Sequence, residues 1–300
     1  MPWSPADIPD QSGRRAVVTG ANSGLGLIAA RELARKGAAV VLACRNQAKG
    51  AAALEQVRAA APGAQAELAR LDLGSLDSVR AFAATQAAPL DLLLNNAGVM
   101  APPRAETADG FELQLGTNHL GHFALTGLLL GALKAASSPR VVTISSNAHQ
   151  LGRIDFDDLQ SRRRYRRWRA YNQSKLANLL FMLELDRRAR AAGLPLASVG
   201  AHPGYSATNL QFAAPPLVDR LVMRVLNRLL AQSGEDGALP VLYAATMPGL
   251  PGASYVGPDG RGGWRGKPQP VGMSRRAQDP DTARRLWEVS ESLTGVTYAF

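Results

Sequence analysis

The feature that most constrains the fold of this chain is a regular alternation of short apolar segments with longer helical patterns. Six short segments rich in Val, Leu, Ile and Ala are predicted strands: residues 15–20, 38–44, 66–73, 90–98, 140–146 and 195–204. Helical patterns fill the five intervals, over residues 25–37, 47–60, 75–86, 110–136 and 171–193. Because neighbouring parallel strands need a crossover helix, this order predicts an α/β fold with a Rossmann-like, doubly wound parallel sheet in three αβα layers.

Length and composition are compatible with a single domain of this kind. The chain has 300 residues, of which 46% are hydrophobic, and no repeat or low-complexity linker divides it. We therefore predict one domain over residues 1–300, with a cofactor-binding and catalytic core over 13–204. Residues 205–300 are predicted to form a substrate lid and a C-terminal extension, and the Gly- and Pro-rich stretch 248–272 is predicted loop.

Three features of the sequence favour a cytoplasmic protein. The only cysteine, Cys44, excludes a disulfide framework and a cysteine-based zinc site. The first ten residues lack the basic start and apolar centre of a signal peptide. The longest mostly apolar stretch, residues 123–133, is too short to span a bilayer as a helix.

A glycine-rich turn follows the first predicted strand. The segment TGANSGLG places Gly20, Gly24 and Gly26 between that strand and a predicted helix. Glycines allow close approach of the backbone to a pyrophosphate, and a helix N-terminus offers free N–H groups. Glycines are also common in ordinary turns, but this position favours a dinucleotide-binding turn.

The end of the second predicted strand bears on the choice between NAD and NADP. An acidic residue there would bind the adenosine ribose hydroxyls and repel a 2′-phosphate. This chain has Cys44 at that place, followed by Arg45. Because a guanidinium binds phosphate well, the pair favours NADP(H) over NAD(H). The alternative is that Arg45 merely begins a solvated helix.

Seven motifs in a fixed order resemble the short-chain dehydrogenase/reductase family over roughly residues 13–210. They are TGANSGLG, Asp72 in LDL, NNAG at 95–98, Asn118, ISS at 144–146, YNQSK at 171–175 and HPG at 202–204. The segments around Asn118 and Tyr171 and the C-terminal tail look closest to the branch that contains retinol dehydrogenases and the WW-domain oxidoreductase. This resemblance implies a Rossmann-fold oxidoreductase.

The chemistry of Tyr171 and Lys175 agrees with the resemblance. The two residues are four apart on a predicted helix and so lie on one face. A phenol titrates near pH 10, and a neighbouring ammonium is expected to lower its pKa. The resemblance implies that Tyr171 is the general acid/base and that Lys175 also holds the nicotinamide ribose. The alternative for Tyr171 is an aromatic side chain packed on a core helix.

The resemblance also implies roles for a serine and an asparagine. Ser146 would polarise the carbonyl oxygen of the substrate. Ser145 is the alternative. Because adjacent residues of a strand face opposite ways, only one of the two serines can contact the substrate. Asn118 would hold a water in a proton relay behind the lysine. Its alternative is a polar residue satisfied within a helix interface.

Further cofactor contacts are implied only by the resemblance. Asp72 is expected at the adenine, Asn96 to Gly98 beside the adenosine ribose, and Thr208 at the nicotinamide amide. The full set of expected cofactor residues is Gly20, Asn22, Ser23, Gly24, Leu25, Gly26, Arg45, Asp72, Leu73, Asn96, Ala97, Gly98, Tyr171, Lys175, Pro203, Gly204 and Thr208.

The four histidines do not indicate a metal site. His119 and His122 are three residues apart on a predicted helix, but no carboxylate or thiol pattern accompanies them or the other two, His149 and His202. Helix packing or local hydrogen bonding is the favoured interpretation, and no metal is expected.

The formal charge of +10 is concentrated in one loop. Residues 162–169 contain six arginines, with Tyr165 and Trp168 among them, and without those six the charge would be +4. Such a run could bind nucleic acid, an anionic substrate or a lipid surface. It could equally be a solvated face opposed by Asp155, Asp157 and Asp158, which is the interpretation we favour; no nucleic-acid partner is expected.

A second candidate surface lies at residues 217–232, where Arg220, Arg224 and Arg228 recur every four residues beside an apolar face. In the family this region forms the substrate lid, and weak peripheral contact with a membrane is the alternative. The family also commonly pairs through the helices that bear Asn118 and Tyr171, which implies a homodimer or homotetramer.

Taken together, these features predict an NADP(H)-dependent oxidoreductase that interconverts a carbonyl and an alcohol on a fairly apolar small molecule. The expected catalytic residues are Asn118, Ser146, Tyr171 and Lys175. The alternative is a catalytically silent dinucleotide-binding regulator or scaffold with the same fold. The intact Tyr171–Lys175 pair argues against the alternative, because a sensor has no need of the acid.

Overall fold

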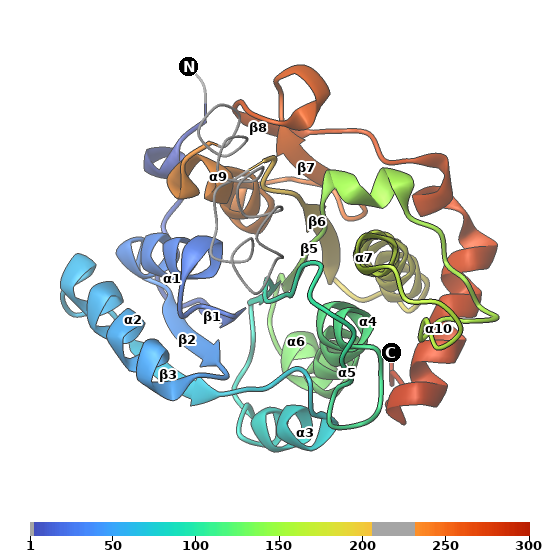
Figure 1. Cartoon of the computed structure of the whole chain (residues 1–300). Helices are drawn as coiled ribbons and strands as arrows, with labels where there is room; N and C mark the ends of the chain where they lie inside the picture. The colour runs from blue at the N-terminus through green and yellow to red at the C-terminus, as the bar shows by residue number, and fades with distance from the viewer. Residues whose placement is uncertain (1–2, 206–231) are drawn as a thin grey trace.

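The computed structural model describes residues 3–205 and 232–300, which contain one eight-stranded sheet (Figure 1). The strand order is β3-β2-β1-β4-β5-β6-β7-β8; β8 pairs antiparallel with β7, and every other pair is parallel. The strands are β1 (Arg15–Thr19), β2 (Ala39–Cys44), β3 (Ala66–Arg70), β4 (Leu92–Asn95), β5 (Arg140–Ile144), β6 (Ala197–Ala201), β7 (Tyr255–Pro258) and β8 (Pro268–Pro270).

The strand order reverses beside β1. The chain runs outward through β2 and β3 and then returns to place β4 on the other side of β1. In such sheets, the crevice at the carboxyl ends of the two strands at the reversal is where ligands bind. The topology therefore predicts a ligand site among the residues that follow β1 and β4.

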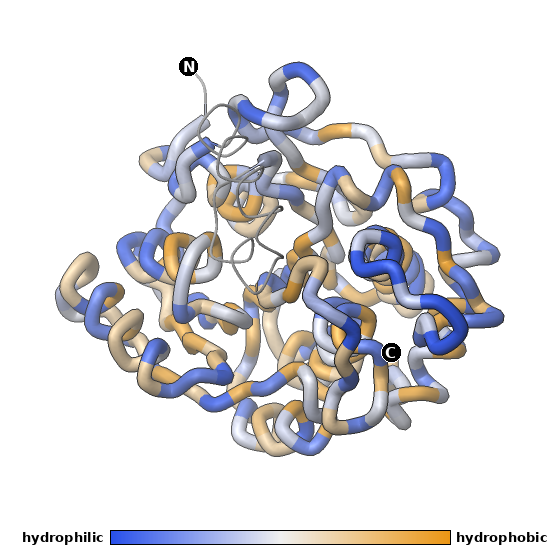
Figure 2. Tube along the Cα trace, viewed as in Figure 1, coloured by the Kyte–Doolittle hydropathy of each residue, from blue (hydrophilic) through white to orange (hydrophobic). Residues whose placement is uncertain are grey.

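Helices cover both faces of the sheet (Figure 1). One face carries α1 (Gly24–Arg35), α2 (Gln47–Ala60) and α9 (Gly234–Thr246); the other carries α3 (Leu76–Ala84), α5 (Gly121–Leu128) and α7 (Arg167–Ala191). Successive residues of β1 alternate between the two cores, with Val17 in one and Val18 in the other. The hydropathy of the chain agrees with cores on both sides of the sheet, since most hydrophobic residues lie toward the centre of the molecule in Figure 2.

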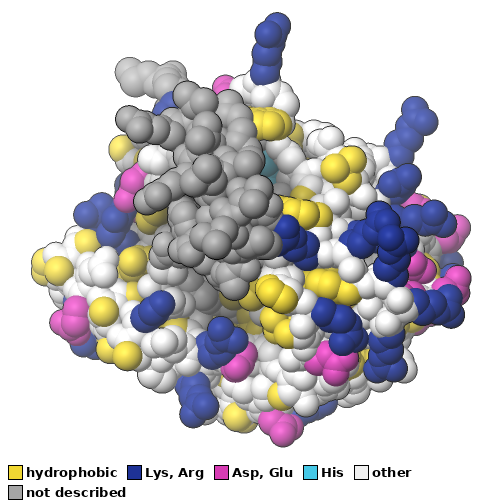
Figure 3. Space-filling model, viewed as in Figure 1, with side chains coloured by type: hydrophobic (Ala, Val, Ile, Leu, Met, Phe, Trp, Pro, Cys, Tyr) yellow, Lys and Arg dark blue, Asp and Glu magenta, His cyan; other side chains and the backbone are white. Residues whose placement is uncertain are grey.

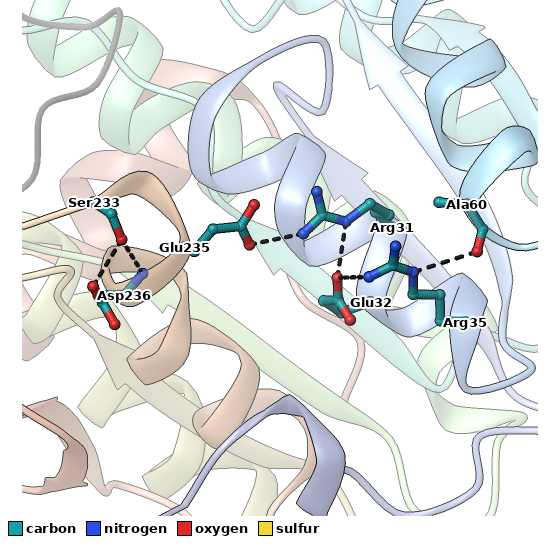
Figure 4. Close-up of polar contacts among 7 residues, drawn as sticks. All are labelled: Arg31, Glu32, Arg35, Ala60, Ser233, Glu235 and Asp236. Carbon is teal, nitrogen blue, oxygen red and sulfur yellow. Dashed lines mark hydrogen bonds and ion pairs between the residues drawn. The ribbon is translucent and has the colours of Figure 1, made fainter.

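Helix α9 is attached to α1 by polar contacts at its N-terminus (Figure 4). Arg31 of α1 pairs with Glu235 at 2.7 Å and with Glu32 at 2.8 Å. The Ser233 hydroxyl caps α9 by accepting the Asp236 N–H at 3.0 Å. These contacts fix the start of α9 against the helix that follows the glycine turn.

The C-terminal helix α10 (Pro280–Thr294) packs against α5 and α7. Its Trp287 is 2% exposed and forms an aromatic cluster with Phe123, Phe181 and Tyr298. The Tyr298 hydroxyl donates to the Phe123 carbonyl at 2.6 Å. The described part of α7 between residues 170 and 186 consequently has no exposed residue.

The structure confirms the predicted α/β class and all six predicted strands, with somewhat shorter ends. The prediction that 248–272 is only loop was wrong, because β7 and β8 lie there. Both are short, and Pro258, Pro268 and Pro270 lie at the sheet edge, where a missing N–H is tolerated.

Two further expectations need correction. The single helix expected over 110–136 is instead divided into α4 (Leu113–Leu115), the π-helical turn η2 (Gly116–Leu120), α5 and α6 (Leu130–Lys134). Much of the predicted lid region belongs to the body of the fold, since α9, β7, β8 and α10 all follow residue 232. Thr208 and residues 217–231 of the expected lid lie outside the described residues.

Within residues 3–205 and 232–300, no helix has the length and apolar character needed to cross a membrane.

Candidate active site

A cavity of about 490 Å³ lies at the carboxyl ends of β1, β4 and β5. Most of the predicted cofactor and catalytic residues line it, although they come from seven separate parts of the chain. They are Gly20, Asn22, Ser23, Gly24, Leu25, Arg45, Asp72, Leu73, Asn96, Ala97, Gly98, Ser146, Tyr171, Lys175, Pro203 and Gly204. Two predicted residues, Gly26 and Asn118, do not line the cavity, and Thr208 is outside the described residues.

The glycine turn has a backbone that other residues would strain. Gly20 and Gly24 have φ angles of +68° and +55°, and a Cβ at Gly20 would lie 3.0 Å from the Ala97 Cα. Helix α1 begins at Gly24, and the side chain of its N-cap residue, Ser23, makes no capping hydrogen bond. The first N–H groups of α1 thus remain available at the cavity, which fits a pyrophosphate.

Gly26 has a packing role that differs from the predicted cofactor contact. It is buried in the first turn of α1, where a Cβ would lie 2.5 Å from Asn96 Nδ2 and 2.7 Å from the Gly20 carbonyl oxygen. The Asn96 amide donates to the Thr19 carbonyl at 2.8 Å. Gly26 therefore allows α1 to approach the turn after β4, and it acts on the cavity through Asn96 and Gly20, which line it.

Cys44 and Arg45, at the end of β2, differ in their exposure to solvent. Cys44 is fully buried, and burial raises the pKa of its thiol to about 11. Arg45 is exposed and lines the cavity. Asp72, which follows the neighbouring strand β3, also lines the cavity, and its carboxylate accepts the Gly74 N–H at 2.9 Å. At this end of the cavity, β2 therefore contributes no acidic side chain, and the Arg45 guanidinium follows the strand.

Tyr171 lies in the cavity beside Ser146. The Tyr171 side chain is 6% exposed, and Ser146 lies close enough to lower the pKa of its phenol, in opposition to burial. The hydroxyl of the neighbouring Ser145 turns away and donates to the Lys175 carbonyl at 2.8 Å. Of the two serine hydroxyls considered from the sequence, the one beside the phenol belongs to Ser146.

Burial dominates the protonation of Tyr171 and Lys175. The Lys175 Nζ donates to the Ile144 carbonyl at 3.2 Å and lies 5.7 Å from the centroid of the Tyr171 ring. Burial lowers the pKa of Lys175 to about 8 and raises the pKa of Tyr171 to about 12, the latter despite the opposing effect of Ser146. The expected lowering of the phenol pKa by Lys175 is therefore not found, and desolvation is the largest effect on this group.

The Asn118 side chain is fully occupied by hydrogen bonds. Its Oδ1 accepts the Val99 N–H at 2.8 Å, and its Nδ2 donates to the Val99 carbonyl at 3.0 Å and to Ser174 Oγ at 2.9 Å. Asn118 is buried in the π-helical turn η2, a geometry often found at functional sites. Its amide therefore fixes the loop after NNAG against α7 behind the cavity.

His122 is a positioning residue, in agreement with the helix packing or local hydrogen bonding favoured from the sequence. It is 1% exposed, and its ring nitrogens contact Thr19 Oγ1 at 2.9 Å and the Asn118 carbonyl at 3.1 Å. Thr19 Oγ1 also accepts the N–H groups of Asn96 and Ala97, each at 2.9 Å. His122 thus links the end of β1, the turn after β4 and the helix that carries Asn118. The sequence did not indicate which groups His122 would contact, because Thr19 is far from it in the chain.

The other histidines are also held in local packing. His119 contacts Ser290 Oγ at 2.9 Å, and His149 contacts the Ser146 carbonyl at 2.7 Å. Burial lowers the pKa of His202 to about 4. Among the described residues, no group of three or more His, Cys, Asp or Glu side chains is arranged to hold a metal ion.

The end of the cavity beyond Tyr171 has an apolar and aromatic wall. Trp168 lies edge-on to the Tyr171 ring, with centroids 6.1 Å apart, and Tyr205 lines the cavity from the segment after β6. Val99, Met100 and Ala148 complete this wall. Sequence reasoning named Trp168 only as part of the arginine run and did not assign this wall to the cavity, because none of its residues belongs to one of the recognised motifs.

The chain belongs to the short chain dehydrogenase family, whose model matches residues 14–215. It is therefore an oxidoreductase of the class that interconverts alcohols and carbonyls, as the ordered motifs implied. It is 43% identical over 302 residues to a mouse (Mus musculus) polyprenol dehydrogenase, covering 98% of this chain and 87% of the relative. It is 42% identical over 290 residues to human (Homo sapiens) retinol dehydrogenase 12, covering 95% and 88%. These relatives confirm the retinol dehydrogenase-like branch.

Solved structures agree with this assignment. An uncharacterised protein from Mycobacterium paratuberculosis is 50% identical, with a TM-score of 0.85 over all of both chains. An NAD(P)-dependent gluconate 5-dehydrogenase from Beutenbergia cavernae, whose structure has NADP bound at low occupancy, is 28% identical. Its TM-score is 0.61 over 78% of this chain and 90% of that chain.

Proposed function

We propose that this protein is an NADP(H)-dependent oxidoreductase that interconverts an apolar aldehyde or ketone with the corresponding alcohol. The observation that carries the proposal is the Tyr171 phenol, which lies beside Ser146 and Lys175 in the same cavity as the glycine turn. An acid, a hydroxyl donor and a buried amine thus converge where a dinucleotide can bind. A binding module without chemistry would have no use for this arrangement.

The residues of this chain suit NADP(H), which when bound supplies the hydride that reduces the carbonyl carbon. The free N–H groups at the start of α1 would hold the pyrophosphate, and Arg45 would hold the 2′-phosphate. Cys44 is buried and leaves no carboxylate at the end of β2 to repel that phosphate. The NADP in the Beutenbergia cavernae structure supports the same assignment.

Tyr171 and Ser146 would act on the carbonyl oxygen. With a pKa raised to about 12, the phenol is protonated at neutral pH and can donate its proton to the oxygen as the C=O double bond is reduced. Ser146 would donate a second hydrogen bond and so stabilise the negative charge that develops there. In the oxidation direction, the phenolate form of Tyr171 would accept the proton of the alcohol, while the hydride leaves the carbinol carbon for the oxidised cofactor.

The substrate class follows from the wall beyond Tyr171. Val99, Met100, Ala148 and Trp168 present mainly apolar surface. The names of the relatives, retinol dehydrogenase and polyprenol dehydrogenase, refer to long apolar alcohols. Oxidation of NADPH with a series of aldehydes of increasing chain length tests this proposal, and turnover of none of them would contradict it.

The cofactor preference predicts a selective effect of Arg45→Ala. A charge-assisted hydrogen bond contributes about 1.5–3 kcal/mol, so KM for NADPH should rise by roughly 10- to 100-fold while KM for NADH changes little. The matched control is Lys49→Ala, an exposed cation on α2 that does not line the cavity. Equal effects of Arg45→Ala on both cofactors would argue against recognition of the 2′-phosphate.

The packing of α10 predicts a monomer rather than the homodimer or homotetramer that the family resemblance implies. Within α5 only Leu128 is exposed, and residues 170–186 of α7 have no exposed member, so pairing through these helices would require displacement of α10. We expect light scattering after gel filtration to give a mass near 31.8 kDa. A mass of twice or four times that value would contradict this expectation.

A further inference from the structure

The arginine-rich segment before and within the start of α7 forms an ordered platform, defined here as residues 161–169. The Tyr165 hydroxyl donates to the Pro102 carbonyl at 2.8 Å and accepts from Gln114 Nε2 at 3.0 Å. The same Gln114 amide donates to the Arg167 carbonyl at 2.9 Å. These contacts hold the platform at the rim of the cavity described above.

The acidic residues upstream oppose this platform only in part: Asp155 is paired with Arg169, as the interpretation favoured from the sequence expects, but Asp158 is not paired with an arginine side chain among the described residues. The Asp158 carboxylate accepts the backbone N–H groups of Arg162 and Arg163, at 2.7 and 3.1 Å, rather than their guanidinium groups. Arg169 is paired with Asp155 at 2.7 Å. Asp158 therefore stabilises the turn of the platform and leaves the arginine side chains to other partners.

Four exposed guanidinium groups result from this arrangement. Arg162, Arg163, Arg164 and Arg166 are exposed, and the described parts of the chain supply no ion-pair partner for any of them. Between residues 151 and 169 the sequence has seven arginines and three aspartates. In Figure 3, which has the same view as Figure 1, Lys and Arg side chains gather on the right, around the start of α7.

Exposed apolar side chains accompany the charge. Trp168 is 45% exposed while it also lines the cavity next to Tyr171. Leu151 is 79% exposed at the end of η3 (Asn147–Leu151), which packs against α7. Tryptophan beside arginine is the combination that suits the boundary between lipid headgroups and acyl chains.

We propose that the platform docks this protein on an anionic lipid bilayer, with Trp168 and the cavity rim facing the membrane. The arginines would interact with lipid phosphates, and the apolar substrate would reach Tyr171 from the bilayer. Delivery of substrate rests on the proposed function, whereas docking does not. A single-stranded nucleic acid is the competing partner, but an exposed leucine and a tryptophan at the mouth of an apolar-walled cavity favour lipid.

The test is flotation of the full chain with vesicles of phosphatidylcholine alone or mixed with phosphatidylglycerol, at low and high salt. We expect binding only to the anionic vesicles, and release at high salt because the charges are screened. Each arginine near an anionic surface contributes roughly fivefold in affinity. A variant with Gln at positions 162, 163, 164 and 166 should therefore bind at least about tenfold more weakly.

A charge-matched control separates the platform from net charge. Lys49, Arg58, Lys134 and Arg284 are exposed and outside the platform, so replacing these four by Gln should leave most of the binding intact. Both variants should reduce a short, water-soluble aldehyde at the wild-type rate, since none of the eight residues lines the cavity. Loss of that activity in both variants would count against the proposed function rather than against docking.

Several outcomes would overturn the docking proposal. The first is equal binding of the protein to neutral and anionic vesicles. The second is a loss of vesicle binding in the control variant as large as that in the platform variant. The third is no flotation at low salt by a chain that still reduces the soluble aldehyde. Binding of single-stranded RNA that depends on the platform, without flotation, would replace the lipid by a nucleic acid and also overturn it.

Discussion

Replacement of Tyr171 by Phe should reduce kcat/KM for carbonyl reduction by at least about a thousandfold, while the fold and the affinity for NADPH are kept. The substitution removes only the phenol oxygen, which is the group positioned to donate a proton to the substrate. General acid catalysis typically accelerates a reaction by about 10²–10⁴-fold, and Tyr171 is also one of two donors to the developing oxyanion. Steady-state oxidation of NADPH and fluorescence titration of NADPH measure the two effects separately.

The matched control for this experiment is Tyr243→Phe. Tyr243 lies on α9, packs against Trp3 and does not line the cavity, so its hydroxyl should not affect turnover. If Tyr171→Phe retained most of the wild-type rate, the assignment of Tyr171 as the acid would fail. If the wild type itself bound NADPH but reduced no carbonyl, the dinucleotide-binding regulator would become the better hypothesis.

Replacement of Lys175 by Met should abolish most of the activity and yet stabilise the fold. Lys175 lies beside Tyr171, so the loss of its amine should lower kcat/KM by a factor on the order of 10²–10⁴. The lysine is 3% exposed, however, and burial disfavours its charged form. Methionine has a similar length and carries no charge, so it removes this cost of burial.

The size and the pH dependence of that stabilisation follow from the pKa of Lys175. In the folded protein it is lowered from 10.5 to about 8, which corresponds to a cost of about 3 kcal/mol for the charged form. Loss of the hydrogen bond to the Ile144 carbonyl offsets about 1 kcal/mol. That carbonyl still accepts from Asn178 Nδ2 at 2.9 Å, so it is not left unsatisfied. The net gain in the free energy of unfolding should be about 2 kcal/mol.

The sign of the pH effect distinguishes this explanation from a general packing effect. Below pH 8 the folded protein must hold a charged Lys175, and the advantage of the Met variant is complete. As the pH rises from about 8 to 10.5, the folded wild type loses this proton before the unfolded chain does, and the advantage disappears. Urea denaturation of both proteins at pH 7 and pH 10 measures this difference. An advantage that is the same at both pH values would contradict a buried charged lysine.

Much of the fold and the site could be predicted from the sequence because the signals are local. The alternation of strands and helices, the glycine turn after β1 and the four-residue spacing of Tyr171 and Lys175 all depend on residues close together in the chain. The two strands that were missed, β7 and β8, are short and contain prolines, which are typical of loops. Only their place at the sheet edge makes prolines acceptable there.

The roles of several residues could not be predicted because they depend on contacts between distant segments. Asn118 is held by Val99 and by Ser174, which is 56 residues away. Gly26 is required by the approach of Asn96, and His122 connects to Thr19 across 103 residues. None of these contacts leaves a pattern in the sequence near either partner.

The sequence by itself determined the family, six of the sheet-forming segments and most of the cofactor-side residues that line the cavity, because periodicity and motif spacing are properties of neighbouring residues. Only the tertiary structure decided the protonation of Tyr171, since burial and the proximity of an ammonium act on its pKa in opposite directions. Likewise, α10 covers α5 and α7, and Asp158 binds backbone N–H groups rather than arginine side chains. Such outcomes depend on which groups share a desolvated space, and this is fixed only when segments far apart in the chain pack together.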